Sequence, residues 1–85
     1  MSQEADQNRR GFTKLMLKLP NLRADLKLLA LQNEHFMGLC GAYDEATATL
    51  ERLRKSDSQA DADMIAEYEA ICVDIEREVI MMTAK

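Results

Sequence analysis

Two long apolar stripes, separated by a short polar segment, most constrain how this chain can fold. The first stripe repeats at intervals of three and four residues as far as Leu53, and the second does so from Met64 to Met82. This spacing is the period of an amphipathic helix. The sequence therefore predicts helices at about 21–55 and 60–82, joined by a turn at 56–59.

The two stripes match each other when the chain is folded back at the turn. In an antiparallel register in which paired residue numbers add up to about 115, nearly every apolar position faces another. Phe36 then faces Val79, and Leu50 faces Ile65. This match predicts an all-α fold, a long antiparallel helical hairpin with coiled-coil character. Three Gly and one Pro are too few for the turns of an all-β fold.

The same register leaves the beginning of the first helix without a partner. The unmatched residues are Leu22, Leu26, Leu28, Leu29 and Leu31. Two covers are open: a short amphipathic segment at 13–19 could fold back as a third helix, or a second copy could pair with the chain as a helical bundle. In both cases residues 1–12 are expected to be a flexible polar N-terminus, followed by a single domain at 13–85.

Charge is distributed unevenly along the chain, although the net charge is only −4. From Arg9 to Lys27 there are six basic residues and one acidic residue, whereas 28–85 holds five basic and twelve acidic residues. The basic segment could fold back on the hairpin, dock on the acidic half of a second copy, or bind an anionic membrane or nucleic acid. The acidic remainder weighs against nucleic acid because it repels phosphates.

No group of residues has the spacing of a catalytic or metal site. His35 stands next to Glu34, and adjacent helical residues do not share a face. Cys40 and Cys72 lack the paired spacing of a zinc site, so they are either two buried thiols or a redox-sensitive cross-link between the helices. We therefore expect no catalytic residue, no cofactor, no metal and no enzymatic activity.

The segment LLALQNEHFMGLCGAY, Leu28 to Tyr43, together with Leu50-Glu51-Arg52-Leu53, resembles the YdcH-like family of short bacterial proteins. The resemblance extends from Leu22 to Met82. It implies a long helical hairpin of unknown function and supplies no site residues. The chain departs from the family at 68–78, which is acidic where the family is Lys-rich, and in its longer basic segment before Pro20.

These observations predict a small, non-catalytic helical module that binds proteins, either a second copy as a homodimer or another protein. The alternative is binding of an anionic membrane surface or nucleic acid through the basic N-terminal segment. The N-terminus has no apolar run and no stretch approaches the ~20 apolar residues of a membrane span, so we expect a cytoplasmic protein. The predicted partner-binding residues are Leu22, Leu26, Leu29, Arg9, Arg10, Lys14 and Lys18.

Overall fold

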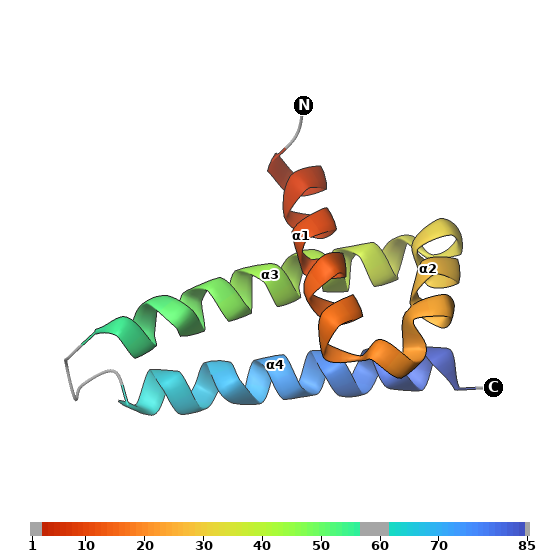
Figure 1. Ribbon diagram of the computed structural model, residues 1–85. Coiled ribbons are helices and arrows are strands. Elements are labelled where there is room, and N and C mark those ends of the chain that lie inside the picture. The colour runs from red at the N-terminus through yellow and green to blue at the C-terminus, as the bar shows by residue number, and fades with distance from the viewer. Residues whose placement is uncertain (1–2, 57–61, 85) are drawn as a thin grey trace.

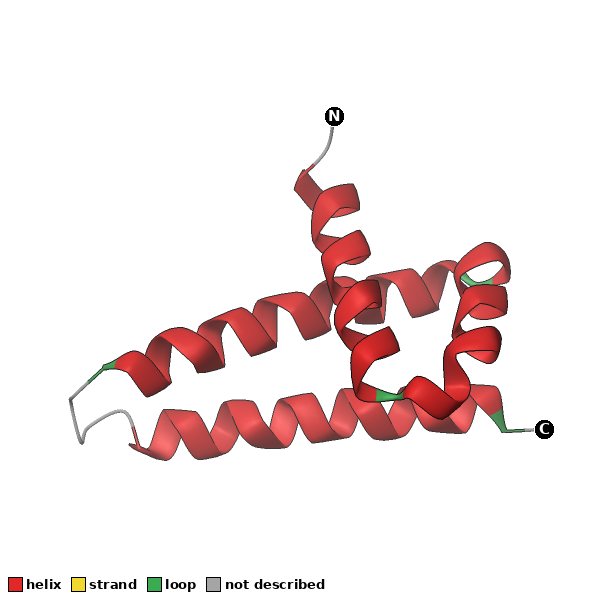
Figure 2. Ribbon diagram, in the orientation of Figure 1, coloured by secondary structure: helices red, strands yellow, loops and turns green. Residues whose placement is uncertain are grey.

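The computed structural model describes residues 3–56 and 62–84, and every regular element in these ranges is helical. The elements are α1 (Gln3–Lys18), a 3-10 turn η1 (Pro20–Leu22), α2 (Arg23–Gln32), α3 (Glu34–Lys55) and α4 (Ala62–Thr83). The predicted all-α fold class is confirmed. Figure 2 shows how little of the described chain lies outside helices.

Helices α3 and α4 lie side by side and antiparallel, as the two apolar stripes predicted (Figure 1). Phe36 and Val79 are both fully buried. The contacts His35–Glu78 and Tyr43–Glu76 fall within about one helical turn of the predicted pairing. Of the predicted turn at 56–59, only Ser56 lies within the described residues; it caps the end of α3.

The first predicted helix, 21–55, is wrong as a single rod, because it is divided at Asn33. Pro20 begins η1, as suits a residue with no backbone N–H to leave unpaired. The backbone of Asn33 is extended, with φ −138° and ψ 107°, and its side chain accepts a hydrogen bond from the Phe36 N–H at 3.1 Å. Asn33 thereby ends α2 and caps α3, which lets α2 point in a different direction.

Replacing Asn33 by Ala should lower the free energy of unfolding by about 1 kcal/mol, because the first turn of α3 loses its side-chain acceptor. Asn33→Asp should retain most of the stability, since its carboxylate can accept the same bond. Urea unfolding followed by circular dichroism measures both variants. If Asn33→Ala and Asn33→Asp lost the same free energy of unfolding, the side-chain acceptor at position 33 would not stabilise α3.

The expected flexible N-terminus at 1–12 is also wrong where the structure describes it, because α1 is one continuous helix from Gln3. The predicted segment at 13–19 is only its C-terminal part. Glu4 and Asp6 near the start and Lys18 near the end suit the helix dipole. Packing against α3 fixes the polar first turns, since the Asn8 amide nitrogen can donate to the Met37 carbonyl oxygen at 3.3 Å.

Helix α1 crosses α3 at very close range (Figure 1). Gly11 is buried against the backbone of Cys40, and a Cβ on Gly11 would overlap the Cys40 carbonyl group. At the next residue of α1, the ring of Phe12 meets that of Phe36, one turn before Cys40 in α3, edge to face with centroids 6.1 Å apart. The crossing therefore depends on a missing side chain at Gly11 and brings an aromatic pair into the core.

The N-terminal segment folds back over the overhang of the hairpin, which was one of the two predicted covers. Leu15 of α1 and Leu26 of α2 are both fully buried and belong to the same core as Phe36 and Val79. The described chain contains no helix that is long and apolar enough to cross a membrane. One core thus joins all four α-helices.

Candidate functional site

The three leucines predicted to bind a partner lie wholly or partly inside the molecule. Leu26 has no exposed surface, and Leu22 and Leu29 are half-buried against the same core. The prediction took the apolar stripe of the overhang as available because nothing in the hairpin register covered it. Since α2 turns at Asn33 and packs on α3 and α4 in the same core as Leu15 of α1, Leu26 is not available for a partner.

Other apolar side chains are exposed at the same end of the molecule. Leu28 and Leu31 of α2 are 51% and 83% exposed, and Ile80 and Met81 of α4 are 44% and 74% exposed. Figure 1 shows α2 and the C-terminal part of α4 at one end of the molecule. We call these four residues the end surface. Of the four, Leu28 also lines a groove of about 180 Å³, together with Asp25, Leu29, Gln32, Met82 and Thr83.

Two of the predicted basic site residues hold α1 on α3. Asp44 is a buried charged residue, with 7% of its side chain exposed. The Lys14 Nζ lies 2.8 Å from its Oδ1, and the Arg10 Nε lies 3.3 Å from its Oδ2. Lys14 and Arg10 thus have a structural partner within the chain, which leaves less of their charge for an external one.

The Lys14 ammonium group has a second partner in α3. It donates a hydrogen bond to the Thr47 Oγ1 at 2.8 Å, while the Thr47 hydroxyl lies 2.8 Å from the Tyr43 carbonyl oxygen, to which it donates. The Tyr43 hydroxyl in turn donates to the Glu76 Oε2 of α4 at 2.6 Å. These bonds join α1, α3 and α4, so the polar cluster has a structural explanation.

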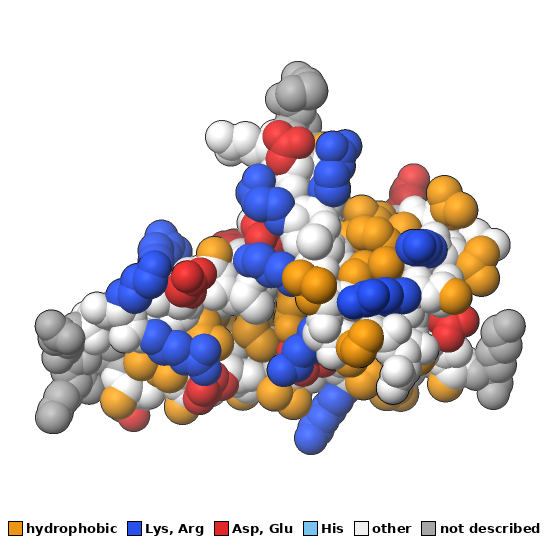
Figure 3. All heavy atoms as spheres, viewed as in Figure 1, with side chains coloured by type: hydrophobic (Ala, Val, Ile, Leu, Met, Phe, Trp, Pro, Cys, Tyr) orange, Lys and Arg blue, Asp and Glu red, His pale blue; other side chains and the backbone are white. Residues whose placement is uncertain are grey.

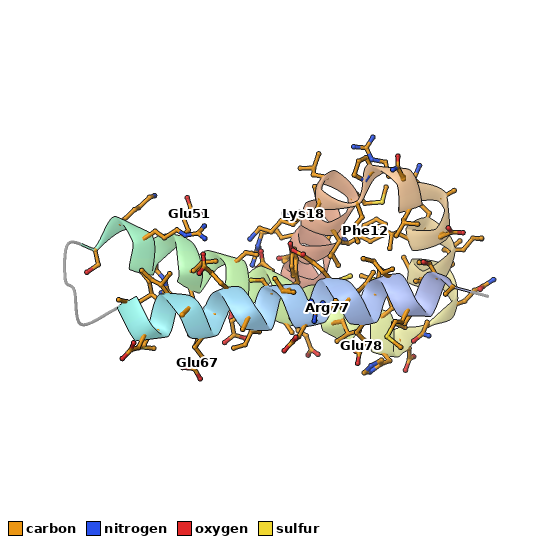
Figure 4. The ribbon with its side chains drawn as sticks, turned by 90° about the horizontal axis from the view of Figure 1, so that it is seen from below. Phe12, Lys18, Glu51, Glu67, Arg77 and Glu78 are labelled. Carbon is orange, nitrogen blue, oxygen red and sulfur yellow. The ribbon has the colours of Figure 1, made fainter. Side chains whose placement is uncertain are left out.

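Arg9 and Lys18 are the predicted basic residues that remain exposed and form no ion pair within the described residues. Lys18 borders a groove of about 310 Å³ between α3 and α4 (Figure 4). Figure 3 shows Lys and Arg side chains over α1, α2 and the C-terminal part of α3 on one face. The basic sequence segment therefore shares this face with Lys and Arg side chains of other helices, and Figure 3 shows acidic side chains among them.

Helix α4 has the opposite charge. It carries six acidic residues and one basic residue, Arg77. In Figure 4, Glu67 and Glu78 extend from one side of this helix, and Arg77 lies on the side turned away from α3. Glu78 is 3.4 Å from the His35 Nε2, and both side chains are largely exposed. The end surface thus joins a basic helix, α2, to an acidic one.

Comparisons with known proteins add no relative to this description. No protein-family model matches the chain. No curated protein and no solved structure matches it either. Within residues 3–56 and 62–84, no group of three or more His, Cys, Asp or Glu side chains is arranged to hold a metal ion. Any assignment of function must therefore come from the surfaces of the molecule.

The sequence contains a signal that separates Leu28 and Leu31 from the other leucines of the predicted overhang. They lie off the stripe formed by Leu22, Leu26 and Leu29. Helical spacing places them on the opposite side of α2, where a cover for the stripe leaves them exposed.

Cys40 and Cys72 are both buried free thiols. Burial raises the pKa of the Cys40 thiol from its usual 9.0 to about 12. Burial, and then the Glu76 carboxylate, raise the pKa of the Cys72 thiol as well. Both cysteines therefore favour the neutral form in the folded protein and act as small apolar core residues.

Raising the pH above about 9 should destabilise the fold, because the thiols ionise in the unfolded chain before they do in the folded one. The stability is complete below the unfolded pKa and is lost towards the folded pKa of about 12. Each protected thiol contributes a decline of about 1.4 kcal/mol per pH unit. In urea unfolding at increasing pH, the free energy of unfolding should decline less steeply for Cys40→Ala than for wild type. An identical slope in both proteins would contradict the assignment.

Proposed function

We propose that this chain is a small, non-catalytic helical module that binds a protein partner through its end surface. The observation that carries this proposal is the exposure of four large apolar side chains at one end: Leu28, Leu31, Ile80 and Met81. Covering such side chains contributes about 25 cal/mol for each Å² of apolar surface removed from water. Exposed apolar patches beside a groove are typical of protein-binding surfaces.

The interior supports a structural role for the ionisable groups. Asp44, Lys14 and Arg10 connect α1 to α3, and Tyr43 and Glu76 connect α3 to α4. Each is paired with another side chain of the molecule and holds helices together, although Tyr43 and Glu76 also line the open groove of about 310 Å³ that Lys18 borders. This arrangement favours a binding module over an enzyme. We place the module in the cytoplasm, where buried thiols remain reduced.

The alternative, binding of an anionic membrane surface or nucleic acid, would use the basic face shown in Figure 3. It has less support because Arg10 and Lys14 already pair with Asp44. If it is correct, replacing Arg9 and Lys18 by Ala should abolish binding to anionic vesicles or DNA, whereas Leu31→Ala should not.

The antiparallel pair α3 and α4 is also the arrangement expected for a YdcH-like protein. Membership of that family is a proposal that rests on the segment from Leu28 to Tyr43. It would not change the surface assigned to binding.

Photo-crosslinking in the native cell tests the binding proposal directly. A photoreactive residue at Leu31 should form a discrete adduct whose second component mass spectrometry identifies. The matched control is the same residue at Leu17, which is 68% exposed but belongs to α1. An identified protein joined to position 31 and absent from position 17 supports the proposal. No adduct at 31, or the same adducts at both positions, would refute it.

A further inference from the structure

We infer that two copies of the chain join through the corner between α1 and α3, in a two-fold dimer that packs α3 of one copy antiparallel to α3 of the other. This inference goes beyond the proposed function, because the corner lies away from the end surface and leaves that surface free in both copies. It follows from the shape of the corner, from the order of charges along α3, and from the position of α1.

The corner lies where α1 rises past α3 (Figure 1). Helix α1 crosses α3 at Cys40 and Gly41, and Gly41 packs against Asn8, so the turns of α1 before Asn8 extend beyond α3. Between these turns and the C-terminal half of α3 lies a groove of about 490 Å³. It is lined by Gln7 of α1 and by Asp44, Glu45, Ala48, Thr49, Glu51, Arg52 and Lys55 of α3.

Four of the lining residues form a stripe along one side of α3. Their order is Glu45, Ala48, Thr49 and Arg52, which is the spacing of neighbours on the surface of a helix. Glu45 and Arg52 are exposed at the two ends of the stripe, and the two small residues lie between them. Within the described residues neither Glu45 nor Arg52 forms an ion pair, and Arg52 donates a hydrogen bond to the Thr49 Oγ1 at 3.1 Å.

The order of these charges makes the stripe complementary to itself. In an antiparallel pair of α3 helices centred between Ala48 and Thr49, Glu45 of each copy faces Arg52 of the other, so two ion pairs form at once. The small side chains at the centre allow the two helices to approach closely. A parallel pair would instead place Glu45 against Glu45 and oppose like charges.

The same register brings α1 of each copy beside the end of α3 of the other. Lys55 then lies opposite Ala42 of the other copy, next to Gly41, where that copy's α1 crosses. The extending turns of α1 carry Asp6, which lines a second groove together with Gln7 and therefore lies on the side of α1 that faces the corner. The last turn of α3 is basic. Opposite charges thus meet at both ends of the interface.

Analytical ultracentrifugation of the full chain over a range of concentrations tests the dimer. Wild type should dimerise at low salt, and high salt should weaken the association by about tenfold or more, because exposed ion pairs are screened. Leu31→Asp changes an exposed leucine of the end surface and should leave the association intact.

A charge exchange within one chain tests the register. Glu45→Arg and Arg52→Glu should each weaken self-association by about tenfold, because each opposes like charges in both ion pairs. The chain with both substitutions should dimerise about as well as wild type, since positions 45 and 52 again hold opposite charges. These positions are two turns apart along α3, so recovery requires a contact between copies.

Chemical crosslinking tests the position of the two-fold axis. Ala48→Cys places an accessible thiol beside the axis, whereas the native Cys40 and Cys72 are buried. A short bismaleimide should therefore join two copies of this variant at low protein concentration. The matched control is Ala70→Cys, at an exposed alanine of α4, which should not be crosslinked.

Wild type that stays a monomer at all concentrations would overturn the inference. A double variant that associates as weakly as the single variants would do the same, as would equal crosslinking at positions 48 and 70. If Leu31→Asp abolished the dimer, the end surface and not the corner would be the interface. Photo-crosslinking at position 31 tests the proposed function separately: a dimer through the corner with no adduct at 31 refutes the proposed function and leaves this inference standing.

Discussion

Gly11→Ala should destabilise the protein by about 3 kcal/mol, although Ala is the better helix former. A methyl group at this position overlaps the carbonyl carbon and oxygen of Cys40. Those atoms belong to the α3 backbone and cannot rotate away, so α1 must move off α3. Moving α1 also separates Phe12 from Phe36 and uncovers Leu15.

The other two glycines provide matched controls for Gly11. A Cβ at Gly38 meets nothing within 4 Å, so Gly38→Ala should stabilise the fold by up to about 1 kcal/mol. A Cβ at Gly41 would overlap the end of the Asn8 side chain, which can turn aside, so the loss should be smaller than at Gly11. Urea unfolding measures all three, and a Gly11→Ala protein as stable as Gly38→Ala would disprove the close crossing.

The antiparallel pair of helices was predictable because its signal is summed over many residues. Each stripe repeats over several turns, and the two stripes match along their whole shared length. A single polar residue in such a pattern changes little in the periodicity. This is why Asn33, which ends one helix and caps the next, looked like a minor interruption of a continuous helix.

The docking of α1 could not be predicted from local sequence. Its first turns are polar, and what fixes them is Asn8 and Gly11 contacting residues about thirty positions away in α3. A glycine in a helix reads locally as a weakness, whereas Gly11 is needed for the close approach. Asp44 is likewise only one of many acidic residues in the sequence. Its burial depends on the position of α1 and could not be read from its neighbours in the chain.

The candidate site illustrates the same limit. The periodic stripe correctly separated one side of α2 from the other, but it left open whether the chain itself or a partner covers Leu22, Leu26 and Leu29. With no cover from within the chain, Leu22, Leu26 and Leu29 would be the exposed side. Because α2 packs this stripe on α3 and α4, in the same core as Leu15 of α1, Leu28 and Leu31 are exposed instead. The tertiary position of one helix thus determines which apolar residues a partner can reach.

Lys14→Met should lower the free energy of unfolding by about 2 kcal/mol, because it removes the closer of the two cations from buried Asp44. Arg10 compensates little, since it is 3.3 Å away and 61% of its side chain is exposed. This expected loss is smaller than for a fully buried ion pair because the Lys14 side chain is itself 37% exposed.

The control for Lys14→Met is an ion pair in solvent. Lys55 and Glu51 are 3.5 Å apart and both largely exposed, so Lys55→Met should cost less than about 0.5 kcal/mol. Adding Asp44→Asn to Lys14→Met should recover part of the loss, because the damage comes from the unpaired carboxylate that remains. Urea unfolding of wild type, Lys14→Met, Asp44→Asn and the double variant gives the coupling energy between residues 14 and 44, and Lys55→Met is measured beside them. If Lys14→Met and Lys55→Met were equally mild, Asp44 would not be the charge that holds α1 on α3.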